Sequence, residues 1–149
     1  FPGNNIAPDK RKARLKRFHT PYHDYLKDLL SEHRPSLILS LHSFTPALES
    51  KPNESRPWEV GVLYNEQEAA SKLAIPFLEH AGYCVGDQLP YSGKLLNATM
   101  NRHAEAHNIP YVGIEMRQDL SSNPNGQARY ARTLAEMCHF VSEQLGLLL

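Results

Sequence analysis

Two short apolar runs each lead into a side chain that can take part in acid–base or metal chemistry. The run 37–41 precedes His42, and the run 109–114 precedes Glu115. A histidine can bind a metal or carry a proton, and a glutamate can act as a general base. Runs of this length are typical of buried strands, and ligands of parallel α/β sheets bind beyond the carboxyl ends of the strands. If the two strands are parallel neighbours, we expect His42 and Glu115 to face one cleft.

The remaining pattern predicts the elements that would hold these strands. Apolar residues at helical spacing favour helices, and short apolar runs favour strands. Alternation of the two favours a mostly parallel sheet with helices on both faces, in a single α/β domain over 1–149. The predicted helices cover 21–33, 66–81, 97–107 and 125–147, and the further predicted strands cover 59–64 and 83–85.

The first of these helices has a recognisable start. Thr20 is a suitable N-cap, and Pro21 suits the first helical position. Helical spacing predicts that Tyr22 and Tyr25 belong to its buried stripe. The basic stretch 9–17 before it is interpreted as a solvated helix face rather than a phosphate-binding arm, because no aromatic residue is interleaved.

Composition limits the classes of partner. Apolar residues make up 41% of the chain and charged residues 21%, and the formal net charge is zero. There is therefore no electrostatic argument for nucleic acid or an anionic membrane as a partner. No apolar run approaches the ~20 residues that span a bilayer. Cys84 and Cys138 lie in apolar-looking segments and are predicted to be buried free thiols, which favours a cytoplasmic location.

Several common catalytic patterns are missing from the sequence. There is no phosphate loop, no G-x-G-x-x-G and no G-x-S-x-G elbow. His103, Glu105 and His107 form H-x-E-x-H, which differs from the H-E-x-x-H zinc signature because Glu105 points away from the histidine pair.

The side chains that remain suit a hydrolytic metal site. A histidine ligand, a free glutamate and arginines that hold an anion are the parts of such a zinc site. His42 and Glu115 would supply the first two, and Arg102, Arg117 and Tyr91 lie on loops and strand ends that could converge on them. The structural alternative is that His42 caps a turn and that Glu115 pairs with Arg117 at the surface.

Six short motifs, in order, carry a resemblance to a known family. The motifs are Tyr22-His23, Leu41-His42-Ser43-Phe44, Gly61-Val62-Leu63-Tyr64-Asn65, Pro90-Tyr91-Ser92-Gly93, Asn101-Arg102-His103 and Gly113-Ile114-Glu115-Met116-Arg117-Gln118-Asp119. Each motif is short, and the specificity lies in their order and spacing. On these motifs, the chain resembles the N-formylglutamate amidohydrolase family from about residue 6 to its C-terminus.

The resemblance implies a fold and an activity. The fold would be phosphorylase/hydrolase-like (zinc peptidase-like), related to zinc carboxypeptidases and aspartoacylases. The activity would be zinc-dependent hydrolysis of an N-formyl or N-acyl amide of an acidic amino acid, such as N-formylglutamate, giving formate and the free amino acid. By position, His42 resembles a zinc ligand and Glu115 the general base and acid. The residues implied to face the substrate are Arg117, Arg102, Tyr91, Asn65 and Ser43.

One departure from the family pattern concerns the metal. Family members are longer at the N-terminus, and that region supplies a histidine and an acidic zinc ligand. We therefore expect this chain to lack the N-terminal part of the domain and, by itself, not to hold zinc tightly. The competing hypothesis is a non-catalytic α/β domain that binds an anion or amino acid and has lost its metal site. A nucleotide-binding domain is disfavoured by the missing phosphate loop.

Overall fold

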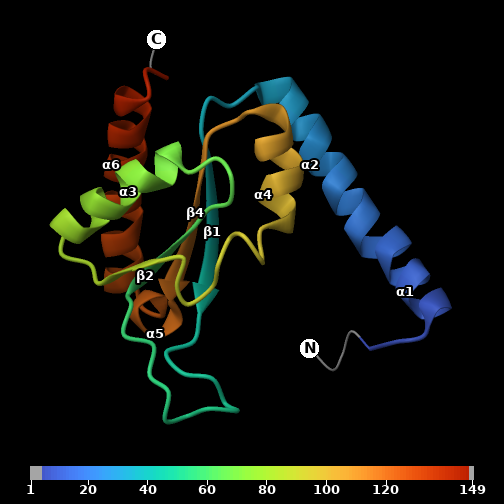
Figure 1. Ribbon diagram of the computed structural model, residues 1–149, viewed down its shortest axis with the longest axis horizontal. Helices are drawn as coiled ribbons and strands as arrows, with labels where there is room; N and C mark the ends of the chain where they lie inside the picture. Colours follow the sequence, from blue (N-terminus) through green and yellow to red (C-terminus); the bar gives the residue numbers. More distant parts are fainter. Residues whose placement is uncertain (1–4, 148–149) are drawn as a thin grey trace. The chain divides into compact units, whose positions relative to one another are not determined.

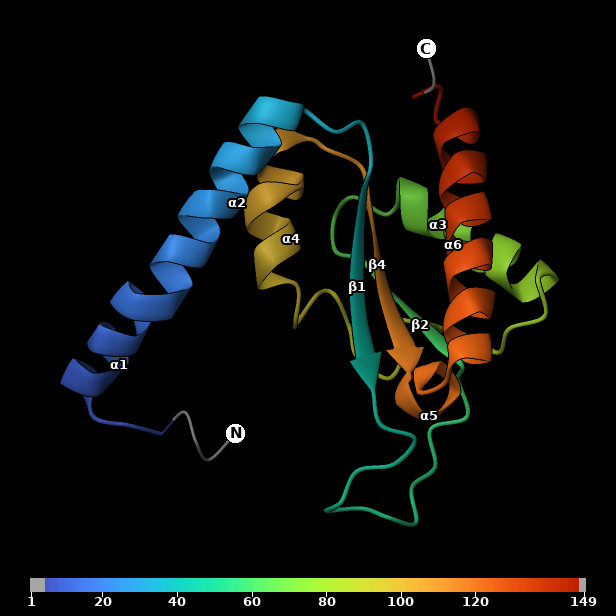
Figure 2. The same ribbon diagram turned by 180° about the vertical axis from the view of Figure 1, so that it is seen from behind.

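The computed structural model describes residues 5–147, and the unit that begins at Ser36 is built on a four-stranded sheet (Figures 1 and 2). Across the sheet, the strands follow the order β1 (Ile38–Phe44), β4 (Tyr111–Arg117), β2 (Val60–Leu63) and β3 (Val85–Asp87). β1 is parallel to β4 and β2 is parallel to β3, whereas β2 and β4 are antiparallel. The α/β class is confirmed, but the sheet is mixed rather than mostly parallel.

The direction of β2 follows from the connection before it. Residues 45–59, between β1 and β2, contain no helix, so the chain turns back at the edge where β1 ends. A parallel connection requires a crossover, usually a helix. The carboxyl ends of β1 and β4 therefore meet at one edge of the sheet, and β2 and β3 end at the opposite edge.

Helices cover both faces of this sheet, as predicted (Figures 1 and 2). On one face, α3 (Ala69–His80) and α6 (Pro124–Gln144) enclose the main core. On the other, Met100 and Ala104, from α4 (Ala98–His103) and just after it, pack against Tyr111. The short elements η3 (Glu105–His107) and α5 (Gln118–Ser121) flank β4 in sequence. The main core contains Val60, Val62, Val112, Ile114, Tyr130, Leu134, Met137 and Val141.

The described residues up to Pro35 form a compact unit separate from the unit that begins at Ser36. It is helical from α1 (Pro8–Arg14) through the π-helical turn η2 (Leu15–His19) to α2 (Thr20–His33). The helix therefore continues through Pro21 instead of starting there. A π turn inserts an extra residue, which relieves the proline ring's clash with the preceding turn.

Two expectations about burial were wrong. Tyr22 and Tyr25 are 54% and 69% exposed, so they do not belong to a buried stripe. Cys84 is exposed, and only Cys138 is partly buried. Both thiols are free, as expected. Over residues 5–147, no helix has the length and apolar character needed to cross a membrane.

Candidate active site

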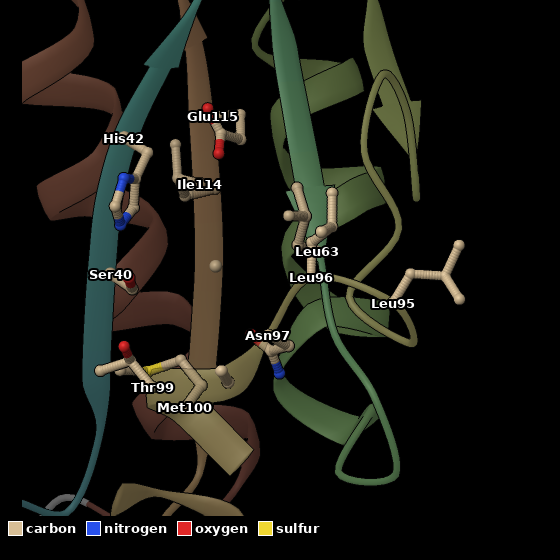
Figure 3. Close-up of a pocket in the computed structure, with 12 residues that line it drawn as sticks. Ser40, His42, Leu63, Leu95, Leu96, Asn97, Thr99, Met100, Ile114 and Glu115 are labelled. Atoms are coloured by element: carbon tan, nitrogen blue, oxygen red, sulfur yellow. The ribbon is translucent and has the colours of Figure 1, made fainter. Parts of the chain in front are cut away.

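His42 and Glu115 are direct partners in the parallel ladder of β1 and β4. Both lie inside their strands, so the alternative in which His42 caps a turn is wrong. Because successive strand residues alternate between faces, partners in register project from the same face. Figure 3 shows the two side chains on neighbouring strands, facing one pocket. The expectation of a shared cleft is confirmed.

The pocket that these two side chains share has a volume of about 440 Å³, a size suited to a small molecule. The strands form its floor, and the start of α4 with the loop before it forms its wall (Figure 3). Both polar and apolar side chains are available to a ligand. The lining residues include Ser40, His42, Leu63, Leu95, Leu96, Asn97, Thr99, Met100 and Glu115.

A glycine allows the loop 88–97 to approach the sheet. Gly61 is the antiparallel ladder partner of Glu115, and a Cβ at position 61 would collide with the carbonyl oxygen of Leu89. The absence of a side chain therefore lets this loop lie directly over β2, beside Glu115. In the same loop, the hydroxyl of Tyr91 accepts a hydrogen bond from Arg56 Nη1 at 3.1 Å.

One oxygen of the Glu115 carboxylate lacks a hydrogen bond among the described residues. This atom, Oε2, is buried. Burial raises the pKa of this carboxyl, and the charges of His42 and Arg56 partly oppose that rise. Glu115 is not paired with Arg117, whose Nε donates to Asp119 Oδ1 at 2.9 Å. The structural alternative of a surface Glu115–Arg117 pair is therefore wrong.

None of the five residues that the resemblance implied to face the substrate lines this pocket, Tyr91 included. Arg117 donates from Nη1 to the carbonyl of Pro57 at 3.2 Å, and Arg102 is exposed on α4. Ser43 follows His42 by one position and so lines a pocket on the opposite face, with Leu41 and Met116 among its neighbours there. Asn65 follows β2 and lies at the other edge of the sheet, because β2 is antiparallel to β4.

That other edge holds a closed hydrogen-bond network. Glu105 accepts from the Tyr111 hydroxyl at 2.7 Å, from the Gln67 N–H at 3.3 Å and from Asn65 Nδ2 at 3.2 Å. Asn97 Nδ2 donates to the Tyr111 hydroxyl at 2.7 Å. Desolvation, together with the bond to Glu105, raises the pKa of Tyr111 to about 12. Glu105, from the H-x-E-x-H motif, therefore has a structural setting in which every oxygen is used.

The comparison with known families decides the relationship. The sequence model of the N-formylglutamate amidohydrolase family matches residues 2–121. The chain belongs to this family. The resemblance drawn from the six motifs is thereby confirmed.

Solved structures agree at the level of fold. A gene product of Agrobacterium tumefaciens shares 24% identity, with a TM-score of 0.85, over 95% of this chain and 57% of its own. An N-formylglutamate amidohydrolase from Ralstonia eutropha shares 15% identity, with a TM-score of 0.61, over 91% of this chain and 54% of its own. The chain thus spans little more than half the length of these two structures. A comparison with curated proteins gave no match.

The donor set in the pocket does not complete a zinc site. Catalytic zinc takes three protein ligands, usually histidines and a carboxylate. In the pocket, His42 offers one imidazole and Glu115 one carboxylate. Within residues 5–147 there is no group of three or more His, Cys, Asp or Glu side chains that could hold a metal. These residues alone therefore do not fit a catalytic zinc ion.

The predictions from sequence did not include Ser40, which lies in a strand, or several residues whose positions depend on loops. Ser40 lies two positions before His42, so strand alternation alone would have placed it on the same face. Asn97 and Thr99 lie at the start of the helix predicted over 97–107, and their place in the pocket depends on how the preceding loop crosses the sheet. Arg56 lies in the loop after β1, and its charge reaches Glu115. The available signal was a charged residue in a long loop that leaves from the edge carrying His42.

Proposed function

We propose that the full-length protein hydrolyses an N-formyl or N-acyl amide of an acidic amino acid, such as N-formylglutamate. The products are formate, or the corresponding acid, and the free amino acid. One observation carries this proposal: a half-buried carboxylate, one oxygen of which is buried and has no hydrogen-bond partner, lies in register with His42 in one pocket, in a chain of the amidohydrolase family. Strongly desolvated titratable groups in a cleft are typical of catalytic sites.

Glu115 is proposed as the general base and then the general acid. Its carboxylate takes a proton from the attacking water, whose oxygen bonds to the acyl carbon. The carbon–nitrogen bond then breaks, and the same proton passes to the departing amine. Water is consumed, and no other reactant is required. Burial without a hydrogen-bond donor favours this role, because it makes the carboxylate a stronger proton acceptor.

His42 is proposed as one ligand of a zinc ion, following the family resemblance. The described residues do not complete that site, so the proposal requires ligands from polypeptide beyond residues 5–147. When bound, zinc would polarise the acyl carbonyl and water. Metal analysis of the full-length protein and of its His42→Ala variant tests this. We expect the wild type to contain zinc and the variant to lose it.

The other residues from the resemblance have unequal support. Tyr91 lies in the loop beside Glu115 and accepts a bond from Arg56, which supports a position at the rim of the pocket. A direct role of Arg102, Arg117, Ser43 or Asn65 in substrate binding stays a prediction. The partner is proposed to be a small acidic amide, and the location the cytoplasm.

A formate-release assay on the full-length protein tests the activity. We expect turnover of N-formylglutamate that depends on Glu115. The second candidate, a non-catalytic domain that binds an amino acid or anion, is favoured by the incomplete metal donor set. Binding of glutamate with no formate release from any N-formyl amino acid would favour that candidate and contradict the hydrolase.

A further inference from the structure

Arg56 is held in place by both its side chain and its backbone. Its guanidinium carbon lies 5.2 Å from the ring centre of Tyr91 and 5.9 Å from that of Phe44. Nη1 donates to the Tyr91 hydroxyl at 3.1 Å and to the Thr45 carbonyl at 3.4 Å. The backbone N–H of Arg56 donates to the Pro46 carbonyl at 2.9 Å. A guanidinium positioned in this way loses little entropy when it binds a ligand.

Among residues 5–147, Arg56 has no directly bonded counter-ion. Its charge acts on Glu115, but no carboxylate in that range forms an ion pair with it, and neither Nε nor Nη2 has a hydrogen-bond acceptor there. Two other arginines of the same unit do form ion pairs, Arg117 with Asp119 and Arg129 with Glu59. A partly buried charge without a partner is costly, so its presence beside a pocket points to an anion supplied from outside.

Strand geometry places this cation near Glu115, on the face of the sheet that carries the pocket, although Arg56 is not among the residues that line the pocket. Phe44, whose ring contacts the guanidinium, lies two positions after His42 and therefore on the same face of β1. Tyr91 belongs to the loop that crosses β2 beside Glu115. The electrostatic effect of Arg56 on Glu115 agrees with this proximity.

We propose that Arg56 binds a carboxylate of the substrate at the carboxyl end of β1, with Phe44 and Tyr91 holding the plane of its guanidinium. The free Nε–H and Nη2–H edge matches the two oxygens of a carboxylate. This inference rests on the proposed function and gives Arg56 the anion-binding role that the resemblance implied for Arg102 and Arg117. The substrate class is then an acylated amino acid whose recognised end is an anion.

The test compares substrates that differ in charge. In the full-length protein, kcat and KM are measured for three substrates. N-formylglutamate carries both carboxylates, N-formylglutamine lacks the side-chain carboxylate, and N-formylisoglutamine lacks the α-carboxylate. Arg56→Met is expected to lower kcat/KM for N-formylglutamate by about 10- to 100-fold, mainly through KM, as expected for a lost charge-assisted hydrogen bond. For the amide analogue that already lacks the recognised carboxylate, Arg56→Met should lower kcat/KM little further. Arg56→Lys, which keeps the charge but not the planar fork, should lie between the wild type and Arg56→Met.

Arg129→Met is the matched control. Arg129 also lies over a tyrosine ring, that of Tyr83 at 4.2 Å, but its charge is not among those that act on Glu115. This variant should keep the wild-type preference among the three substrates. Equal losses on all three substrates in Arg56→Met would overturn the proposal, because they would indicate a structural role only.

A binding measurement separates this inference from the proposed function. Titration calorimetry with L-glutamate needs no turnover. Weaker glutamate binding in Arg56→Met than in the wild type, without formate release by either protein, would support the carboxylate site and contradict the hydrolase. Turnover of N-formylglutamate with an unchanged KM in Arg56→Met would support the hydrolase and overturn the role of Arg56.

Discussion

Two glutamates near opposite ends of β4 are in contrasting environments. Before the strand, Glu105 accepts hydrogen bonds from Tyr111, Gln67 and Asn65. Within its second half, Glu115 has a buried oxygen without a partner and a raised pKa. A satisfied carboxylate holds elements together, whereas an unsatisfied one costs stability and keeps its proton affinity high. The contrast separates the structural glutamate from the candidate catalytic one without reference to any relative.

The largest expected effect is on turnover. Glu115→Gln in the full-length protein should lower kcat by about 10²- to 10⁴-fold, because an amide cannot take a proton from water. The measurement is formate release from N-formylglutamate. Glu79→Gln, an exposed change on α3, serves as the control and should keep wild-type turnover. Full turnover by Glu115→Gln would remove the distinction between the two glutamates.

The next effect is on folding. Glu105→Gln should lower the free energy of unfolding by about 1–3 kcal/mol, because an amide cannot accept all three hydrogen bonds. Urea denaturation measures this change. Glu136→Gln, exposed on α6, is the matched control and should be nearly neutral. If Glu105→Gln were as stable as its control, the network would not be structural.

Alkaline pH should weaken the same network. The pKa of Tyr111 is about 12 in the folded protein, against an ordinary value of 10.0. The folded state therefore favours the protonated hydroxyl, and this stabilisation is complete below pH 10.0 and lost as pH rises towards about 12. Tyr111→Phe should lose about 1 kcal/mol at neutral pH and show a smaller further loss in alkali. Equal alkaline losses in both proteins, measured by denaturation, would contradict this assignment.

The smallest expected effect is on the stability of the Glu115→Gln variant. Because burial raises the pKa of Glu115 above 4.5, its ionised form destabilises the fold as pH rises through the folded-state pKa. Glu115→Gln should therefore be more stable than the wild type at neutral pH, and this advantage should disappear below pH 4.5. Denaturation at the two pH values measures the difference. A less stable Glu115→Gln at neutral pH would show that the carboxylate is satisfied after all.

The part of the fold that sequence predicted best was the pair of strands that carries His42 and Glu115. Their apolar runs were long enough to recognise, and parallel pairing in register needed no further information. The direction of β2 was not predicted, because the alternation of strands and helices favours a parallel sheet, whereas the helix-free connection 45–59 reverses the chain. Asn65, which follows β2, therefore lies at the edge opposite to the ends of β1 and β4.

The parts of the site that sequence did not predict depend on how loops fold. Arg56 comes near Glu115 only because its loop folds back so that its guanidinium contacts Phe44 and Tyr91. Asn97 lines the pocket because the loop before it crosses the sheet at Gly61. Neither loop conformation produces a periodic pattern of apolar residues in the sequence, whereas strands and helices do.

The in-register pairing of β1 with β4 also constrains how this site can change during evolution. A point substitution beside His42 or Glu115 leaves the two positions opposite each other. An insertion or deletion of one residue before either of them, within its strand, turns one side chain to the other face. We therefore expect the strands 38–44 and 111–117 to accept substitutions but not length changes, and length variation to concentrate in the loop 45–59, away from the position of Arg56.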